Sequence, residues 1–378
     1  MAAIIINPFP VSAYHGPDMF CNREEEVKRL QSNIENGVNT TLLSIRRMGK
    51  TGLLHHLFER LSRKRNTWCL YADIYATQDQ KDFLNQFASA ILKAFPPKKT
   101  VGKRVLDFIT SLRPVISYDN LTGQPEISFT SSQPKQQEQS LSSLLAFLDS
   151  LNANVVIAFD EFQQIGEYPE KNTEALLRTL IQPLKNVHFI FSGSSKHVLT
   201  QMFTNNKRPF FGSTQMLELN NIERKVYELF IQEKFAGVRR KISKDALQFI
   251  CEWTRLHTYY TQVVCNRLFA DGYTIINKSL VQETCSRILD EQEVTFFQYR
   301  NLLTNVQWQA LKAIAREDKL YQPNAKSFIS KHKLGTPSNV QRSLEALLVK
   351  EMIYKEKDEE GNYYSVYDCF LARWLQRL

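Results

Sequence analysis

The clearest chemistry in the sequence lies in eight consecutive residues, Ser-Ile-Arg-Arg-Met-Gly-Lys-Thr, at positions 44–51. They directly follow the apolar, β-branched run 40–45 and precede a segment, 52–65, whose leucines have helical spacing. The pattern GxxxxGK[ST] is met except that Ser44 stands at the first glycine. In such a loop the backbone N–H groups and the helix N-terminus bind phosphate, and Gly49 lets the backbone approach closely. The sequence therefore predicts a phosphate-binding loop.

Two side chains of this loop have specific expected roles. Lys50 should reach the β- and γ-phosphates of a nucleotide, and the Thr51 hydroxyl should ligate magnesium. The alternative, a chance Gly-Lys-Thr in a basic loop, would not require a strand before it and a helix after it. We therefore expect ATP or ADP with Mg²⁺ as the cofactors. The other residues expected to line the bound phosphates are Arg46, Arg47, Met48, Gly49 and Gly52.

A second motif is the apolar run 155–159 that ends in Asp160 and Glu161. An acid at the carboxyl end of a buried parallel strand lies at the ligand edge of the sheet. We expect Asp160 to hold magnesium through water and Glu161 to orient or deprotonate the attacking water. The alternative is that the two acids only cap a helix.

Three weaker candidates come later in the chain. Ser192 begins the polar group 192–195 after a strand, and it is either a nucleotide sensor or part of a turn. Arg208, in a loop, is a candidate arginine finger, although a lone loop arginine is more often solvated. His257 lies at the aromatic-rich start of a helix and has no second metal ligand near it in sequence.

The elements that must position these residues divide into three parts. Residues 1–220 alternate continuous apolar strands with helices, which indicates an α/β fold with a parallel sheet covered on both faces. The segment 96–140 interrupts this core, with a β-hairpin expected at 115–129 and a Ser/Gln-rich loop at 130–140. Residues 221–303 are expected to be helical throughout. Residues 304–378 show helix–turn–helix and two β-like runs, which predicts a winged helix.

Composition excludes several classes of protein. Hydrophobic residues make up 43% and charged residues 23%, which excludes wholesale disorder. No apolar run is long enough for a transmembrane helix, and the N-terminus lacks the basic region of a signal peptide, so we expect a cytoplasmic protein with no membrane partner. The six cysteines are scattered singly, which disfavours disulfides and zinc. The net charge of +9 suits an anionic ligand.

The motifs together resemble the archaeal-type ATPases, a branch of the STAND class of AAA+ P-loop NTPases. The resemblance rests on the loop residues 46–51 and on segments 7–9, 20–26, 160–163, 191–195, 208–212, 257–262 and 367–375. It covers essentially the whole chain, and it implies an ATP-binding core, a helical lid and a winged helix. It also implies that Phe9, Phe20 and Arg23 line the adenine side of the site, and it adds His257 as a lid residue near the nucleotide.

The sequence departs from the family pattern at three positions. Ser44 replaces the first loop glycine, which is expected to tighten the loop without abolishing binding. Ser213 stands where an arginine commonly follows Phe-Phe-Gly, which weakens the assignment of Arg208 as a finger. Thr258 replaces the proline usual after His257, which weakens nucleotide sensing by the lid.

Two functions from different classes remain. The favoured one is an ATP-binding, slowly hydrolysing molecular switch, whose partner would be a protein contacted through the winged helix. The other is a DNA-binding regulator with a mainly structural nucleotide site. Its expected recognition helix, 338–350, has only Arg342 and Lys350 as cations, and the wing 358–360 is acidic. We therefore expect weak, unspecific DNA binding, with core residues such as Lys98 and Lys99 contributing. The oligomeric state is left open, and a hydrolysis-dead scaffold is disfavoured by the intact motifs.

Overall fold

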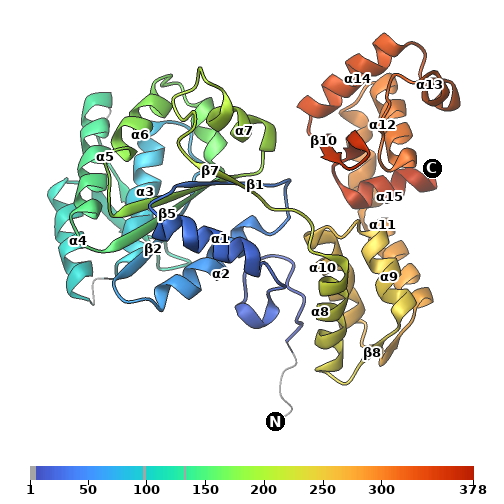
Figure 1. Ribbon diagram of the computed structural model, residues 1–378, viewed down its shortest axis with the longest axis horizontal. Helices are drawn as coiled ribbons and strands as arrows, with labels where there is room; N and C mark the ends of the chain where they lie inside the picture. The colour runs from blue at the N-terminus through green and yellow to red at the C-terminus, as the bar shows by residue number, and fades with distance from the viewer. Residues whose placement is uncertain (1–5, 97–98, 132) are drawn as a thin grey trace. The chain divides into compact units, whose positions relative to one another are not determined.

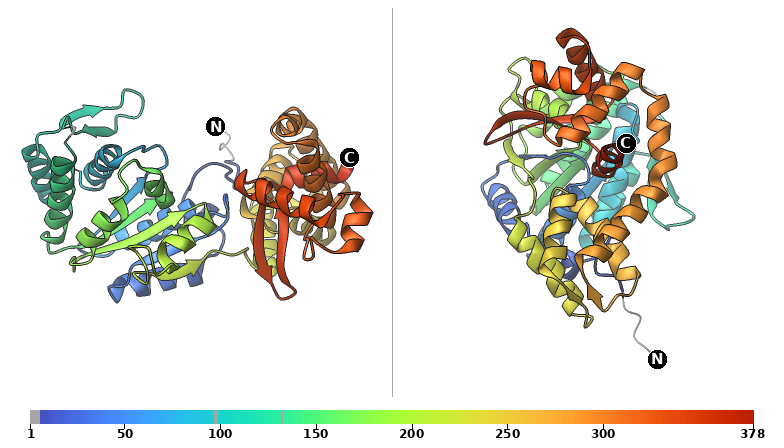
Figure 2. Two further views of the ribbon diagram at one scale, coloured as in Figure 1. Left: turned by 90° about the horizontal axis from the view of Figure 1, so that it is seen from above. Right: turned by 90° about the vertical axis from the view of Figure 1, so that its right-hand side faces the viewer.

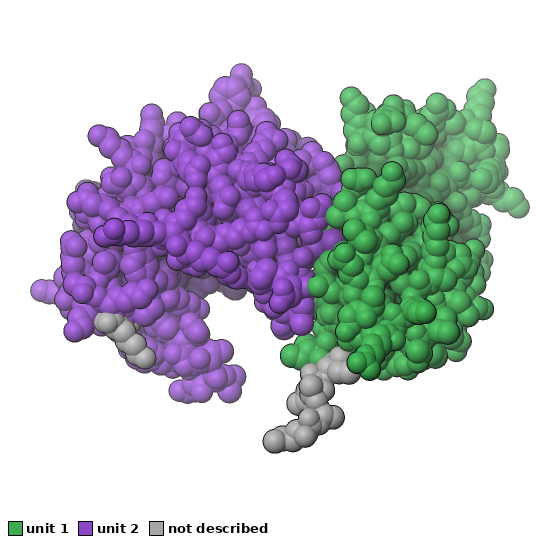
Figure 3. Space-filling view, turned by 60° about the horizontal axis from the view of Figure 1, so that its bottom comes forward, with its two compact units in different colours: residues 1–11, 222–378 green, residues 12–221 purple. Residues whose placement is uncertain are grey.

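The computed structural model describes residues 6–96, 99–131 and 133–378, and the chain divides into two compact units (Figure 3). One unit comprises residues 12–221 and the other combines residues 6–11 with 222–378. The short N-terminal segment therefore belongs with the helical part of the chain, which differs from the predicted range of 1–220 for the core. Lys98 lies outside the described residues.

A five-stranded sheet in the order β2-β5-β6-β1-β7 forms the centre of the first unit, and every pairing in it is parallel (Figure 1). Its strands are β1 (Thr40–Leu43), β2 (Thr67–Asp73), β5 (Asn154–Asp160), β6 (Val187–Gly193) and β7 (Gln215–Glu218). Continuous apolar sequences suit such strands because both faces of the sheet are covered. The predicted α/β fold is confirmed.

Two apolar clusters cover the two faces of this sheet. Val156, Ala158 and Ile190 pack with α1 (Glu24–Glu35) and α2 (Lys50–Ser62). The alternating residues Ile157 and Phe159 pack on the other face with the remaining helices. These helices include α3 (Gln80–Ala94), α5 (Pro134–Asp149), α6 (Thr173–Ile181) and α7 (Lys196–Thr204), and short 3₁₀ turns occur at Pro17–Met19 and Phe162–Glu167.

The insertion after α3 contains α4 (Thr100–Ser111) and the antiparallel hairpin β3 (Val115–Tyr118) with β4 (Pro125–Ser128). The hairpin was predicted, and Gly123 supplies the positive φ of 65° in its turn. The loop predicted at 130–140 is wrong from residue 134 onward, because α5 begins there. Pro134 occupies the first helical turn, where a missing N–H costs nothing, and the helix buries Gln137 and Leu141.

The second unit contains a helical lid and a winged helix. The lid has α8 (Arg224–Ala236), α9 (Lys244–Trp253), α10 (Thr258–Ala270) and the long α11 (Lys278–Asn301), seen in the right-hand view of Figure 2. The expectation that strands are absent here is wrong, because β8 (Lys241–Ile242) and β9 (Ile275–Ile276) form a short parallel pair.

The winged helix follows from residue 305. It contains α12 (Asn305–Glu317), α13 (Lys326–His332), α14 (Pro337–Val349), the antiparallel wing strands β10 (Ile353–Asp358) and β11 (Gly361–Val366), and α15 (Cys369–Arg377). Thr304 forms a capping box with Gln307 at the start of α12. The apolar residues Leu344, Leu347 and Ile353 are buried in this domain's own core, and Leu348 is half-buried. Of the helices that the structure describes, none combines the length and apolarity needed to cross a membrane.

Candidate functional site

The predicted phosphate-binding loop connects the carboxyl end of β1 to the amino end of α2. Gly49 is the residue before the helix and has a φ of 95°, a conformation that favours glycine. Arg47 has a φ of 63°, and the Arg46 and Arg47 side chains are exposed, whereas Met48 is buried. The loop backbone thus makes the sharp turn that leads into the helix N-terminus, where the unpaired N–H groups favour an anion.

Lys50, the first residue of α2, is buried and turns back toward the loop. Its Nζ lies 3.1 Å from Ser44 Oγ, 3.5 Å from Ser44 O and 3.4 Å from Ile45 O. Burial lowers the pKa of Lys50, while the nearby carboxylates of Asp160 and Glu161 oppose that shift. The Lys50 ammonium can therefore bind a further anion once a bound cation offsets the negative charges of Asp160 and Glu161.

The two predicted magnesium residues lie together. Thr51 Oγ1 donates a 2.8 Å hydrogen bond to Oδ2 of Asp160, although 109 positions separate them in the chain. Asp160 is buried at the end of β5, and the hydroxyl and carboxylate are the hard oxygen donors that Mg²⁺ prefers. Among the described residues no cluster of three or more His, Cys, Asp or Glu could hold a metal. The site thus fits a magnesium ion that takes most of its ligands from water and phosphate.

Tyr71 is a site residue that the sequence analysis missed. Its hydroxyl donates a 2.8 Å hydrogen bond to the same Asp160 Oδ2, and burial followed by the Asp160 charge raises the pKa of Tyr71. The phenol therefore stays protonated and donates. Because Tyr71 on β2 pairs in register with Ala158 on β5, its contact with Asp160 depends on strand order, which no local motif encodes.

Glu161 follows Asp160 in the left-handed conformation, with a φ of 58°. Its Oε2 accepts hydrogen bonds from the Ser194 amide at 3.1 Å, the Ser194 hydroxyl at 2.8 Å and Gln163 Nε2 at 2.5 Å. Ser194 is thus the serine of the group 192–195 that contacts this acid, and the sensor role of Ser192 stays a prediction. Ser192 Oγ is buried and has no hydrogen-bond partner among the described residues. A Cβ at Gly193 would lie 2.0 Å from Gln163 Oε1, so a larger residue there would displace the Gln163 side chain.

Arg208 lies on the loop after α7 and is neither free nor fully solvated. Its Nε donates a 3.0 Å hydrogen bond to Glu174 Oε2, and its Nη2 bonds to the other carboxylate oxygen. Burial raises the pKa of Glu174, which the Arg208 charge counteracts. Ser213, at the departure from the family pattern, donates to the carbonyl of Phe210 at 2.7 Å. The finger role of Arg208 stays a prediction.

The residues expected on the adenine side divide between the two units. Phe20 stacks on His56 with ring centroids 4.4 Å apart, and Gly52 lies beside it because a Cβ there would be 3.4 Å from Phe20. Arg23 is buried and donates to the Asn220 carbonyl at 2.7 Å and to the Met48 carbonyl at 3.5 Å. It therefore ties the phosphate loop to the end of the core.

The other two expected residues belong to the lid unit. The Phe9 ring is 0% exposed and packs 5.0 Å from the Phe235 ring, so protein encloses it. His257 precedes α10 as its N-cap residue and its ring lies 4.6 Å from that of Tyr260. A nucleotide contact by either residue stays a prediction.

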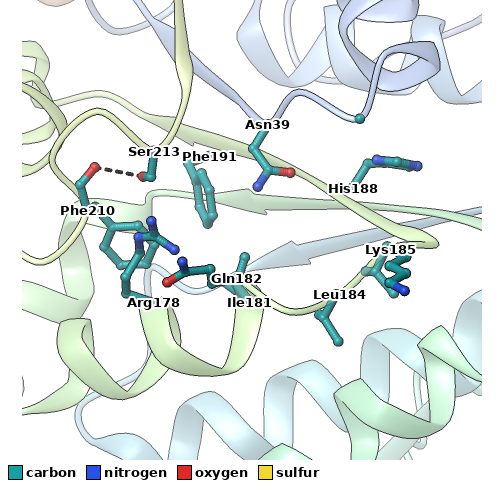
Figure 4. A pocket seen from close by; sticks show the side chains of 12 residues that line it. Asn39, Arg178, Ile181, Gln182, Leu184, Lys185, His188, Phe191, Phe210 and Ser213 are labelled. Atoms are coloured by element: carbon teal, nitrogen blue, oxygen red, sulfur yellow. Dashed lines mark hydrogen bonds between the residues drawn. The ribbon is translucent and has the colours of Figure 1, made fainter.

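A pocket of about 210 Å³ lies elsewhere in the core unit (Figure 4). Asn39, which precedes β1, and His188 near the start of β6 line it, together with Arg178 and Gln182. It is therefore at the amino ends of these strands, whereas ligands of open parallel sheets bind at the carboxyl ends. None of the predicted site residues line it, and we assign it no role.

Comparison with known proteins places this geometry in a family. A family model described as "ATPase domain predominantly from Archaea" matches residues 20–255, and one described as "Probable winged helix domain" matches residues 294–377. No significant match was found among curated proteins.

Two solved structures illustrate the shared fold. The Walker-type ATPase PABY2304 of Pyrococcus abyssi is 19% identical with a TM-score of 0.67, covering 98% of this chain and 100% of that one. The ORC2 protein of Aeropyrum pernix, solved as ADPNP–ADP complexes, is 15% identical with a TM-score of 0.59, covering 98% of this chain and 96% of that one. Since the archaeal ATPase model matches more than half of the chain, the protein belongs to this ATPase domain family and has a winged helix at its C-terminus.

Proposed function

We propose that this protein binds ATP with Mg²⁺ at the loop 44–51 and hydrolyses it slowly, acting as a nucleotide-dependent switch of the AAA+/STAND type. The observation that carries the proposal is the 2.8 Å hydrogen bond between Thr51 and Asp160. It unites the phosphate loop with the acidic strand end, which is the pairing that a magnesium–nucleotide site needs.

In this proposal the residues of the core have separate tasks. The loop N–H groups and Lys50 bind the phosphates, and Thr51 with Asp160 holds Mg²⁺, which when bound would offset the charge that develops on the phosphate oxygens. Glu161 orients the attacking water and accepts its proton. In the structure the bonds from Ser194 and Gln163 are all accepted by Oε2 of Glu161, which leaves Oε1 to accept a hydrogen bond from a water.

The switch itself requires that nucleotide binds one arrangement of the two units more tightly than another. A ligand shifts an equilibrium only by its differential affinity for the two states. Family resemblance supports a contribution from the lid through His257. The winged helix would then transmit the change to a protein partner.

DNA regulation is the second candidate, and the winged helix gives it limited support. Gln341, on the expected recognition helix, donates to Glu345 at 3.0 Å, and the wing residue Asp358 accepts from Lys319 at 2.6 Å and from Tyr321 at 2.7 Å. These side chains are engaged within the domain. Residues 305–378 carry 12 basic and 9 acidic residues, a weak excess for binding a polyanion.

A nucleotide-release assay on the purified chain, with and without Mg²⁺, tests the proposal. We expect ATP or ADP to be bound stoichiometrically and ATP to be turned over slowly in the presence of Mg²⁺. A chain that neither retains nor binds adenine nucleotides at millimolar concentration would contradict the proposed function.

A further inference from the structure

Ser44, the residue at the atypical first position of the loop, contacts the loop lysine. Its hydroxyl donates to the Ile45 carbonyl at 2.8 Å, which leaves its lone pairs to accept from Lys50 Nζ at 3.1 Å. The Ser44 and Ile45 carbonyls lie 3.5 Å and 3.4 Å from the same nitrogen. An ammonium group has three N–H donors, so these three oxygens account for all of them.

The Ser44 hydroxyl makes the shortest of the three contacts, and it is a feature of the side chain alone. Ser44 and Lys50 are both buried, so water is a poor substitute for these oxygens. Ser44 is not among the residues with positive φ, so the backbone does not require glycine here. A glycine at this position would keep both carbonyls and remove only the hydroxyl.

We propose that Ser44 sets the nucleotide affinity of the site by holding Lys50 against the loop. This inference rests on the proposed function, because it concerns how Lys50 becomes available to phosphate. To bind a phosphate oxygen, Lys50 must give up at least one loop oxygen, and the hydroxyl is the contact that costs most to lose. The family pattern, with glycine at this position, lacks that competitor.

Two substitutions separate the hydroxyl from the backbone. Ser44→Ala and Ser44→Gly both remove the hydroxyl, but only Ser44→Gly adds backbone freedom. Ser62→Ala, at the exposed end of the same helix, is the matched control. Calorimetric titration of each protein with ATP, with inorganic tripolyphosphate and with adenosine tests the proposal, because Lys50 should contact phosphate and not the nucleoside.

We expect Ser44→Ala and Ser44→Gly to bind ATP and tripolyphosphate roughly three- to tenfold more tightly than the parent. Adenosine binding should be unchanged, and Ser62→Ala should behave as the parent. Unchanged or weaker ATP binding by Ser44→Ala would overturn the proposal, since the hydroxyl would then be neutral or would position Lys50 for phosphate. A gain in Ser44→Gly alone, or an equal gain for adenosine, would also overturn it.

Failure of the proposed function gives a different result. If neither the parent nor the Ser44 variants bind ATP or tripolyphosphate, the phosphate site itself is wrong and the inference falls with it. Binding that is undetectable in the parent but present in Ser44→Ala would support the inference strongly.

Discussion

Two regions of this protein are candidate binding sites for an anion, and they differ in structure. At the carboxyl edge of the core sheet, Lys50, Thr51, Asp160 and Glu161 are brought together from two segments, and most are partly or fully buried. On the winged helix, Arg342 on α14 and Lys350, the residue directly after this helix, are both exposed.

The difference teaches that the fold alone does not assign the ligand. Buried charges with fixed partners are costly to assemble, so they indicate a site at which binding or chemistry repays that cost. Exposed cations on a helix surface are ordinary in soluble proteins. The core therefore has the features of a specific anion site, whereas the exposed cations of the winged helix give no comparable support for one.

Among the variants expected to keep ATP binding, the largest effect is expected for Glu161→Gln. The amide keeps the shape of the side chain but cannot accept a proton, so turnover should fall by about 100-fold or more while ATP binding persists. The measurement is steady-state phosphate release beside equilibrium nucleotide binding. Glu167→Gln, exposed at the end of the following 3₁₀ turn, is the control. Equal turnover in Glu161→Gln and parent would remove Glu161 from the mechanism.

Tyr71→Phe should weaken the magnesium dependence of nucleotide binding. It keeps the ring but removes the hydrogen bond to Asp160, and loss of such a supporting contact typically costs about tenfold or more in metal affinity. The readout is the Mg²⁺ concentration that gives half-maximal ATP binding. Tyr168→Phe is the matched control, because the Tyr168 hydroxyl contacts Thr77 at 2.5 Å instead. An unchanged Mg²⁺ requirement in Tyr71→Phe would mean that Tyr71 does not position Asp160.

Arg208→Ala should act on stability more than on ATP affinity. Glu174 would lose its ion-pair partner, at a cost of about 1 kcal/mol of unfolding free energy, because the Arg208 side chain is partly exposed. Since burial raises the pKa of Glu174, the folded state disfavours its charged form. Removing Arg208 disfavours the charged form of Glu174 further, so the loss of unfolding free energy should be largest near pH 7.

The same loss should shrink as the pH falls through the raised pKa of folded Glu174, and it should be absent below the unfolded glutamate pKa of about 4.3, because the carboxyl is then neutral in both states. Thermal melts of Arg208→Ala and of Lys207→Ala across this range provide the measurement. A turnover rate that rises with protein concentration in the parent and stays low in Arg208→Ala would instead establish a finger acting between subunits.

The smallest effect is expected at the winged helix. Duplex DNA binding should be weak, independent of sequence and lost by about 200 mM salt. Replacing both Arg342 and Lys350 by alanine should change it by less than about threefold. Core residues Lys99, Lys103 and Arg104 should account for most of what is measured. Nanomolar binding that survives physiological salt and disappears in the double variant would promote the DNA-regulator alternative.

Local sequence predicted the parts of the molecule that local sequence determines. The apolar runs 40–45 and 155–159 predicted β1 and β5. The residues between β1 and the helix that follows it predicted the phosphate-binding loop. The start of α5 was missed because Ser and Gln dominate its first turns and hide the apolar face that begins at Leu141. The short β8 and β9 were missed because two residues give no periodicity.

Contacts between distant segments could not be predicted, since they depend on strand order and register. Tyr71 reaches Asp160 across 89 positions, and Arg208 reaches Glu174 across 34. Phe9 packs among lid aromatics, although an apolar N-terminal segment would suit either core equally well. In each case the sequence gives the type of residue but does not identify the residue that it contacts.

The most direct test of the central claim is equilibrium ATP binding by the parent and by Lys50→Ala in the presence of Mg²⁺. Lys64→Ala, which removes a surface lysine paired with Glu35 just after the same helix, controls for loss of charge. We predict that the parent and Lys64→Ala bind ATP alike. Lys50→Ala should show no detectable binding, because it lacks the ammonium group that is expected to contact the phosphates. Parent-like ATP binding by Lys50→Ala would contradict the assignment of the phosphate site.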